Sequence, residues 1–590
     1  MASVKQDIDL YLFECIDYFT FMTRMTCMQT FCASCALSFT VMDDDLAFYD
    51  QVSPIFGGKK YGIPPPTLCP DCRQQRRLSI VNERNFYTTT CGLCKKRTMT
   101  EHPSESGKTV YCRDCWFSDR WDSCSYGKDV DFTQPIFPQI LELVRSVPAL
   151  NLLAEGTNVN SDYIHYAGYA KNCYLIMHAD FCEDCYYGYG FKKNTSCVDG
   201  FYNLSCQLCY DCVDVHSCYG LKGSQDCVNC SSSAFLRDCI GCKNCFLCAG
   251  LRNKEYCFEN EQLSKADYEA RVAAIDLSSY RQYQGCKVKR AEVEKNHPFK
   301  QLHTHNLENC SGDYLQNCKD TQCSFDCEDV ERGKFLYQVV TGAKNVYDIY
   351  QYGLNLRESY ECSIAGTESY GIRFTHNAHN SCAELLYCWY IQTSKNCFGC
   401  VNMNRKQYCI FNKQYTKQQY EELVPKIIDY MKKTGEWGEF FPTTFSPFGY
   451  NKSSAQMYYP LTKAEALKRG WKWDDSKEEP PVVSKIIAAS MLPDAITDIP
   501  DDILNWAVEC EVTNKPYKIT PQELRFYREQ NLPVPRRCPD QRHLDRFAQR
   551  NPRKFFDRPC AKCKKAIRTT YSPEEPETVY CEECYLTSVY

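Results

Sequence analysis

The chain has 590 residues, of which 24% are charged, and a formal net charge of −5 at neutral pH. This length exceeds what a single hydrophobic core usually organises, so several domains are expected. The net charge excludes a uniformly basic nucleic-acid coat but not local basic faces. The 43 cysteines indicate either a disulfide framework in a secreted protein or metal sites and buried thiols in a reducing compartment.

Residues 1–26 are interpreted as an N-terminal extension. They contain apolar patches, which are interrupted by four carboxylates: Asp7, Asp9, Glu14 and Asp17. A secretory signal peptide instead has a basic head and an unbroken apolar core, and no later stretch reaches the ~18 apolar residues of a membrane span. Because most cysteines lie in CxxC pairs, the sequence favours a cytoplasmic, reducing location without a membrane span. A virion is the alternative location if the source is viral.

Residues 27–125 are predicted to form a tandem zinc-ribbon module. Two CxxC pairs have the short separation that is typical of a closed tetrahedral S₄ zinc site, and a longer gap separates two further pairs. The predicted ligands are Cys91, Cys94, Cys112 and Cys115 for the first site, and Cys32, Cys35, Cys69 and Cys72 for the second. Four-coordinate sites without an open position are structural rather than catalytic.

A helical connector at residues 126–160 is expected to lead into a first cysteine-rich β-solenoid at residues 161–262. Cysteines recur there at a constant spacing of 21, as at Cys185, Cys206, Cys227 and Cys248. A fixed period near 20 is typical of stacked repeats, so we predict a parallel β-helix with about 21 residues per coil and thiols buried as small hydrophobes. The run CIGCKNCFLC at residues 239–248 leaves an iron–sulfur cluster as an alternative.

The solenoid is predicted to occur twice, because residues 246–272 match residues 398–424 at an offset of 152. In each copy a helix follows the last coil, starting at the capping boxes Ser264-x-x-Asp267 and Thr416-x-x-Gln419. The predicted segments are a capping helix and linker at 263–300, a second β-solenoid at 301–412, a second capping helix at 413–435 and a Pro-rich linker at 436–504. The expected fold is therefore mainly β, with two tandem solenoids between ribbon modules.

Residues 505–590 repeat the N-terminal ribbon module, at an offset of 469 from Cys69 onward. One predicted zinc site is complete in this copy, with the ligands Cys560, Cys563, Cys581 and Cys584. The other retains Cys510 and Cys538 but has Thr513 and Gln541 where the N-terminal copy has cysteines. We therefore predict a metal-free ribbon there, with completion by His543 as the alternative. The chain is expected to bind about three zinc ions.

Several phrases carry a resemblance to known proteins from about residue 27 onward. They are CPDCRQQRR, RNKEYCFEN, NRKQYCIFNKQYTKQQYEELVPKI, YPLTKAEALKRGWKW and PQELRFYREQNLPVPRRCPD. With these phrases the chain resembles zinc-ribbon, cysteine-rich repeat proteins of candidate-phyla bacteria and giant viruses. The resemblance implies the ribbon and repeat architecture and implies little about mechanism.

The first functional hypothesis is a scaffold that binds nucleic acid, RNA or DNA, or a ribonucleoprotein. A basic run follows the second CxxC position of each module, and clustered arginines bind phosphates while neighbouring aromatic rings stack on bases. The candidate residues are Arg73, Arg76, Arg77 and Arg84 in the first module, and Arg542, Arg546, Arg550 and Arg553 in the second. The alternative interpretation is that these arginines form salt bridges within the ribbon, with Asp540 and Asp545 among the partners.

Two other classes of function stay open. A structural or assembly protein, virion-associated if the source is viral, would bind protein partners along a tyrosine-rich solenoid face. A β-helix enzyme acting on carbohydrate is the least favoured, and we predict no catalytic residue and no enzyme activity. The local histidine clusters are His303 with His305 and His376 with His379, and the sequence contains no phosphate-binding glycine loop, nucleophile elbow or HExxH motif.

Overall fold

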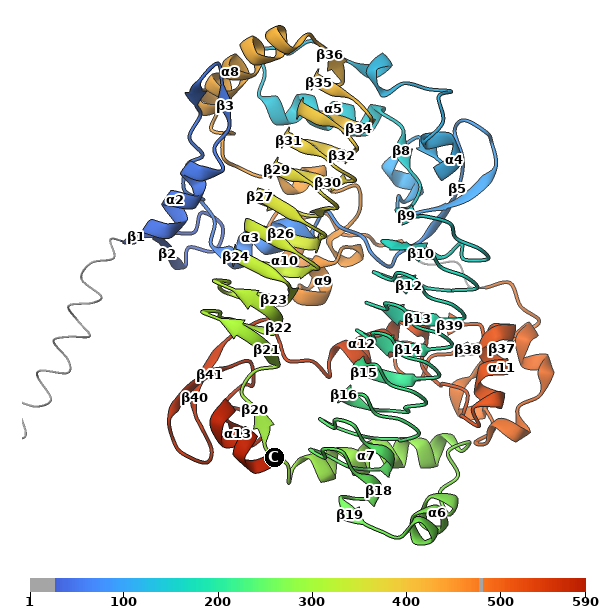
Figure 1. The fold of residues 1–590 in the computed structure, drawn as a ribbon. Coiled ribbons are helices and arrows are strands. Elements are labelled where there is room, and N and C mark those ends of the chain that lie inside the picture. The colour runs from blue at the N-terminus through green and yellow to red at the C-terminus, as the bar shows by residue number, and fades with distance from the viewer. Residues whose placement is uncertain (1–26, 477–480, 590) are drawn as a thin grey trace, which may run out of the picture. The chain divides into compact units, whose positions relative to one another are not determined.

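The computed structural model describes residues 27–476 and 481–589 of the chain (Figure 1). The predicted extension at residues 1–26 lies outside this range. The described residues cluster into two compact units. The first contains the residues up to Asn151 together with Thr304–Asp474, and the second contains Leu152–His303 together with the residues from Asp475 onward. Each unit combines one ribbon module with solenoid coils that are remote from it in sequence. Among the described helices, none is long and apolar enough to cross a membrane.

The mainly β fold and the β-solenoid are confirmed, but the predicted coil length is wrong. In the second unit, most strands pair in parallel with the next coil, as in Ile164↔Ile176, Tyr186↔Val198 and Lys243↔Glu255. The coil period is therefore 12 and not 21. The strands are β9 (Ala154–Glu155), β10 (Ile164–His165), β11 (Ala167–Gly168), β12 (Ile176–Met177), β13 (Tyr186–Tyr189), β14 (Val198–Phe201), β15 (Tyr210–His216), β16 (Gln225–Val228), β17 (Lys243–Phe246), β18 (Glu255–Phe258) and β19 (Glu261–Gln262).

A shorter period of three within each coil explains the error. Every third residue points inward, as Cys206 and Cys209 do, and every third residue has a left-handed backbone, with φ of 56° at Leu208 and 54° at Asp211. Such a position tolerates Gly, Asn and Asp best, which accounts for their frequency here. Twenty-one is a multiple of three but not of twelve. Cysteines with that spacing therefore share the inward position without stacking on each other.

The inward cysteines are free thiols with hydrogen-bond partners. The thiol of Cys206 donates to the carbonyl oxygens of Leu204 and Val215, both at 3.3 Å, and the other core cysteines repeat this pattern. The run at 239–248 occupies four successive inward positions, and its sulfurs are not among the cysteine groups that converge within 4.8 Å in the described residues. The structure therefore gives no support to the iron–sulfur alternative.

The coils of the first unit are less regular. The residue numbers of strand partners differ by 12 near the two ends, as in Asp313↔Phe325 and Lys395↔Gln407, but by 13 in the middle, as in Val346↔Ser359. The longer coils explain why the cysteine spacing drifts in this copy. The strands are β21 (Thr304–Glu308), β22 (Gly312–Lys319), β23 (Ser324–Glu328), β24 (Val330–Lys334), β25 (Tyr337–Val340), β26 (Ala343–Gly353), β27 (Leu356–Cys362), β28 (Ala365–Gly366), β29 (Tyr370–Arg373), β30 (His376–His379), β31 (Ala383–Leu386), β32 (Trp389–Gln392), β33 (Lys395–Phe398), β34 (Val401–Asn404), β35 (Gln407–Ile410) and β36 (Lys413–Gln414).

Helices follow both sets of coils where the capping boxes predict them. Ser264 and Thr416 accept hydrogen bonds from the backbone N–H groups of Asp267 and Gln419, and thereby cap the first turns of the two helices. The helices outside the ribbon modules are α5 (Ile136–Ser146), α6 (Lys265–Ala273), α7 (Tyr280–Glu294), α8 (Lys417–Thr434), α9 (Ala455–Tyr458) and α10 (Lys463–Lys468). Helix α5 lies in the predicted connector.

The ribbon modules consist of short hairpins and helices. The N-terminal module contains β1 (Cys27–Phe31), β2 (Ser38–Met42), α2 (Asp43–Gln51), β3 (Ile55–Phe56), β4 (Lys59–Lys60), α3 (Pro70–Leu78), β5 (Tyr87–Thr90), β6 (Arg97–Thr100), β7 (Val110–Tyr111), α4 (Arg113–Trp116) and β8 (Ala149–Leu150). The C-terminal module and its approach contain β37 (Lys485–Ala488), β38 (Trp506–Glu509), β39 (Pro516–Tyr517), α11 (Pro521–Glu529), α12 (Pro539–Phe547), β40 (Phe556–Pro559), β41 (Ala566–Thr569), β42 (Val579–Tyr580) and α13 (Glu582–Val589), with β20 (Phe299–Lys300) paired to β42.

Candidate metal centres and the basic residues beside them

Three groups of four cysteines converge so closely that each could hold a metal ion. Within each group all four sulfurs lie within 4.8 Å of one another; the groups are Cys32, Cys35, Cys69 and Cys72; Cys91, Cys94, Cys112 and Cys115; and Cys560, Cys563, Cys581 and Cys584. These are the twelve cysteines that the sequence selects. In each group a hairpin turn supplies one CxxC pair and the start of a short helix, or the turn leading into it, supplies the other.

The sulfur separations fit a tetrahedral ion. Four thiolates about 2.3 Å from a central zinc would be about 3.8 Å apart. The distances between Sγ atoms are 3.7 Å for Cys35 and Cys69, 3.7 Å for Cys94 and Cys112, and 3.8 Å for Cys563 and Cys581. Both the donor set and its dimensions are therefore those of a closed S₄ site.

Backbone N–H groups stabilise the thiolate form that a metal requires. The N–H of Cys112 donates to Sγ of Cys91, and that of Cys581 donates to Sγ of Cys560, both at 3.3 Å. Burial raises the pKa of the Cys91 thiol, but backbone N–H donors outweigh burial and lower the pKa to about 6. The same balance lowers the pKa of Cys560 to about 6. One sulfur in each of these two groups is thus favoured as a thiolate at neutral pH, whereas burial raises the pKa of Cys112, and the neighbouring Cys581 thiol that of Cys584, to about 12.

The predicted ribbon around Cys510 and Cys538 has a hairpin, β38–β39, and a following helix, α12, although it has two cysteines and not four. Cys510 and Cys538 are buried, and Oγ1 of Thr513 lies 3.8 Å from Sγ of Cys538. His543 is not directed at this pair, because its ring packs against Tyr189 and Phe201 with centroid separations of 5.4 Å. The structure therefore does not support completion of the site by His543.

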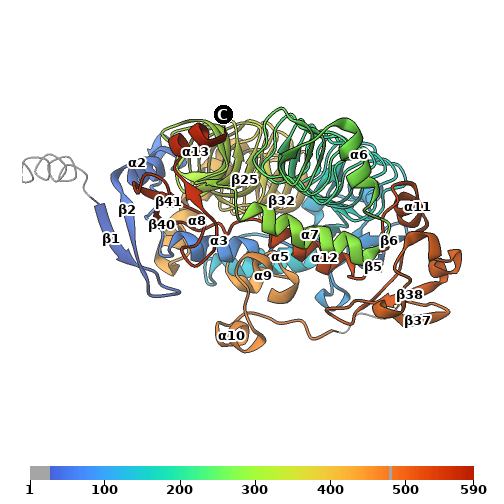
Figure 2. The same ribbon diagram turned by 90° about the horizontal axis from the view of Figure 1, so that it is seen from below.

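Helix α3, which carries the CPDCRQQRR phrase, contacts β26 of its own unit, and in Figure 2 it lies along one side of the coils. Arg73 donates from Nε and Nη2 to the two oxygens of Asp348, at 3.0 and 2.9 Å. Arg77 donates to Asp348 at 3.0 Å and to Glu361 at 2.9 Å. The exposed fractions of Arg73 and Arg77 are 1% and 0%. Burial disfavours the charge on Arg73, but the carboxylates outweigh it and raise its pKa.

The second unit repeats this arrangement with helix α12. Arg542 and Arg546 both approach Asp199 at 3.0 Å, and Arg546 also lies 4.0 Å from Asp211. Glu523 of α11 adds a further contact to Arg542, at 3.3 Å. All four solenoid carboxylates, including those of the first unit, sit at left-handed positions of consecutive coils. We call each set an arginine clamp: Arg73, Arg77, Asp348 and Glu361 in the first unit, and Arg542, Arg546, Asp199 and Asp211 in the second.

An aromatic ring completes each clamp on the preceding coil. The guanidinium of Arg73 lies 5.3 Å from the centre of the Phe335 ring, and that of Arg542 lies 4.5 Å from the Tyr187 ring. The four clamp arginines therefore form salt bridges, as the alternative interpretation predicts. Their main partners, however, are carboxylates of the solenoid coils and not of the ribbon. As placed, these guanidiniums do not face solvent and do not offer a surface to phosphate.

The remaining candidate arginines form ion pairs or are half-buried. Arg76 pairs with Glu361 at 3.2 Å and Glu439 at 2.9 Å, and Arg550 pairs with Asp214 at 2.8 Å. Arg84 and Arg553 are half-buried. None of the eight candidates is fully exposed, so neither unit presents its four as an open basic surface.

Sequence reasoning missed a different basic feature. Lys95 and Lys96 follow the CxxC of the β5–β6 hairpin, and Lys564 and Lys565 follow that of the β40–β41 hairpin. All four side chains are exposed, and in the described part of the chain none forms an ion pair with a carboxylate. We call these pairs the lysine tips. The same offset of 469 relates the two lysine pairs, so the internal repeat could have identified them from the sequence.

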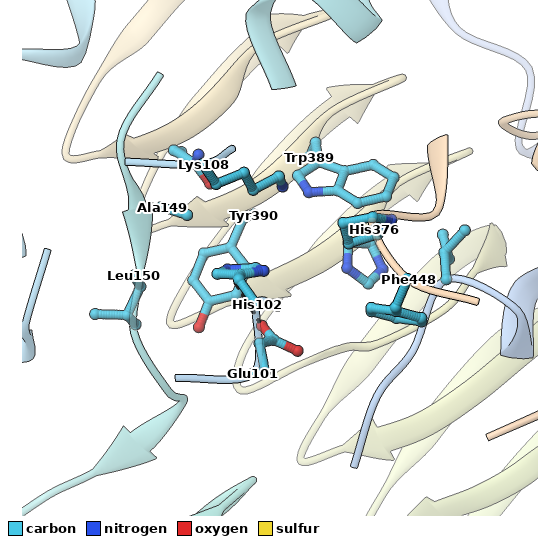
Figure 3. Close-up of a pocket in the computed structure, with 12 residues that line it drawn as sticks. Glu101, His102, Lys108, Ala149, Leu150, His376, Trp389, Tyr390 and Phe448 are labelled. Carbon is cyan, nitrogen blue, oxygen red and sulfur yellow. Dashed lines mark ion pairs between the residues drawn. The ribbon is translucent and has the colours of Figure 1, made fainter. Parts of the chain in front are cut away.

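A histidine cluster lies in the first unit around a small cavity (Figure 3). The His376 and Trp389 rings are 4.2 Å apart, and Nδ1 of His376 lies 2.6 Å from the Ser363 hydroxyl. Glu101 and Lys108 also line the cavity, and burial lowers the pKa of Lys108 to about 8. The volume is about 10 Å³, which admits roughly one water. This cavity has no room for a carbohydrate substrate.

His376 and His379 predict a pH dependence of stability in the first unit. Burial lowers the pKa of each imidazole to about 3, whereas an unfolded histidine titrates near 6.5. Below pH ~6.5 the unfolded chain therefore binds more protons, and stability falls by about 1.4 kcal/mol per pH unit for each histidine. Urea unfolding between about pH 7.5 and 5.5 should show a shallower slope in H376Q/H379Q than in wild type. Equal slopes would contradict the burial of neutral rings.

Comparison of the chain with protein-family models and with curated proteins finds no match. The resemblance to zinc-ribbon, cysteine-rich repeat proteins therefore stays a prediction, and function has to be argued from the site itself.

Proposed function

We propose that the protein is a zinc-binding multi-domain scaffold that binds nucleic acid through its two lysine tips. The observation that carries the proposal is that Lys95 and Lys96 recur as Lys564 and Lys565, exposed in both copies, while the neighbouring arginines are buried in clamps. Phosphate binding requires cations that reach solvent, and the lysine tips meet this requirement.

Zinc is the metal that the proposal assigns to the three cysteine groups. Four thiolates at tetrahedral spacing are typical of structural zinc. The ribbons are too small to build a hydrophobic core of their own, so a metal would fix each hairpin and hold its lysine tip in position. Tyr87 and Phe556 begin the first strands of the two hairpins, opposite Thr100 and Thr569, and therefore lie at the ends away from the lysine tips.

The test is a salt series with labelled single-stranded RNA and duplex DNA. Changing Lys95, Lys96, Lys564 and Lys565 to glutamine should weaken binding and flatten the dependence of log K on log salt. Each lost phosphate contact removes about 0.9 from the slope for duplex DNA and about 0.7 for single strands. The matched control changes four exposed lysines outside the ribbons: Lys265, Lys289, Lys426 and Lys433.

The control variant carries the same change of charge, so it should bind nearly as wild type does. Equal losses in both variants would mean that only net charge matters, and unchanged binding in the lysine-tip variant would refute the proposal. Metal content is measured in parallel, because lysines beside a thiolate site also offset its negative charge.

Protein binding along the solenoid is the second candidate. Tyr169 and Phe181 occupy the same position on consecutive coils, are 52% and 57% exposed, and stack with ring centroids 4.7 Å apart. Exposed aromatic pairs of this kind are frequent in protein interfaces. This candidate would be favoured if the salt series detects no nucleic-acid binding at all.

A further inference from the structure

The β1–β2 hairpin of the N-terminal module has an open strand edge. Among the described residues β1 pairs with β2 alone, in the antiparallel register Cys27↔Met42 to Phe31↔Ser38. Within residues 27–476 and 481–589 no strand covers the other edge of β1, and natural proteins usually cover or blunt such an edge because it can template another strand.

The duplicated hairpin shows what covers this edge in the other unit. Cys32 corresponds to Cys510, so Met28–Phe31 corresponds to β38. Strand β38 pairs with β39 on one side and with β37 on the other, where Ile486↔Ala507 and Ile487↔Val508 are parallel partners. In β38, which has β37 as its neighbour, Ala507 and Val508 are 0% and 1% exposed. The matching positions of β1, Gln29 and Thr30, are exposed and half-buried.

One exposed side chain of β1 and one directly before β2 differ in chemistry between the copies. Phe31 and Leu37 of the first hairpin are 74% and 68% exposed and flank the Cys32–Cys35 turn. The corresponding residues of the second hairpin are Glu509 and Lys515. At these two positions the uncovered hairpin is the more apolar of the two, which a solvent-facing role does not require.

We propose that β1 is a docking edge for an extended, apolar segment of a protein partner. The segment adds as a parallel strand, as β37 does on β38, and its apolar side chains cover Phe31 and Leu37. Main-chain hydrogen bonds supply affinity in this mode, and alternate side chains supply specificity. This surface is separate from the lysine tips, so the chain would join nucleic acid and protein through different ribbons.

Hydrogen–deuterium exchange of the zinc-loaded full chain tests the proposal. The probe is a synthetic peptide of residues 482–490, VVSKIIAAS, which contains β37. Antiparallel pairing with β2 uses alternate amides of β1, so those of Gln29 and Phe31 face the open edge. These two amides should exchange quickly in the free protein and at least about tenfold more slowly with the peptide, since strand pairing protects them. A peptide with proline at both isoleucine positions lacks the amide donors and should give no protection.

A protein variant completes the design. F31E/L37K copies the residues of the covered hairpin, and it should lose peptide protection while retaining its full metal content as evidence of folding. Absence of protection in wild type at millimolar peptide would overturn the proposal. Slow exchange of the Gln29 and Phe31 amides before peptide is added would also overturn it, because the edge would then be occupied already. A chain lacking residues 1–26 and a dilution series would identify that occupant as the chain itself or a second copy.

Discussion

Replacing Arg77 with methionine is expected to lower the free energy of unfolding of the first unit by about 3–5 kcal/mol. The change leaves Asp348 and Glu361 buried with one cation fewer, and removal of one partner of a buried ion pair costs this much because an uncompensated charge remains. The unfolding can be followed by tryptophan fluorescence, since six of the seven tryptophans lie in the first unit.

Arg145 supplies the matched control. It is exposed on helix α5 of the same unit, and R145M should change the free energy of unfolding by no more than about 0.5 kcal/mol. If R77M were as mild as R145M, the buried contacts of Arg77 would not hold the ribbon module to its solenoid.

Removal of the metal is expected to have the second large effect. Structural zinc contributes about 10–16 kcal/mol to the folding of small zinc-finger peptides. Chelation should therefore abolish amide protection in the β5–β6 and β40–β41 hairpins, while the solenoid coils, whose thiols are bonded to carbonyls and not to metal, should keep theirs.

Metal stoichiometry of cysteine variants sharpens this expectation. Wild type should bind three ions, and C91S and C560S should each bind two. C538S should still bind three, because Cys538 and Cys510 lack the other two ligands of a closed site. A fall in the metal count of C538S, measured by elemental analysis, would contradict this assignment.

The three convergent cysteine groups were predictable because their determinants are local. Each CxxC places two sulfurs on one turn, and a second CxxC on the same short module completes the set. The start sites of α6 and α8 were predictable for the same reason, since Ser264 and Thr416 act within one helical turn. The coil length was not predictable. Spacings of 12 and 21 are both multiples of three, and the cysteines show only that every third residue points inward.

The arginine clamps could not be derived from the sequence. Asp348 lies 271 residues from Arg77, and nothing in a local pattern specifies which solenoid a ribbon module packs against. Both copies of the CPDxR phrase were recognised as a repeat, but the repeat of their partners was not. Asp199 and Asp211 lie at matching places on consecutive coils, as do Asp348 and Glu361, so the partners become visible only when the coil length is known.

A double-mutant cycle between Arg77 and Glu361 tests the central claim most directly, namely that the repeated arginine phrase binds each ribbon module to a solenoid within its own unit. Unfolding free energies are measured for wild type, R77M, E361Q and the double variant. The clamp predicts a coupling energy of at least about 1.5 kcal/mol, with the double variant more stable than the two single losses imply. Additivity within about 0.5 kcal/mol would contradict it.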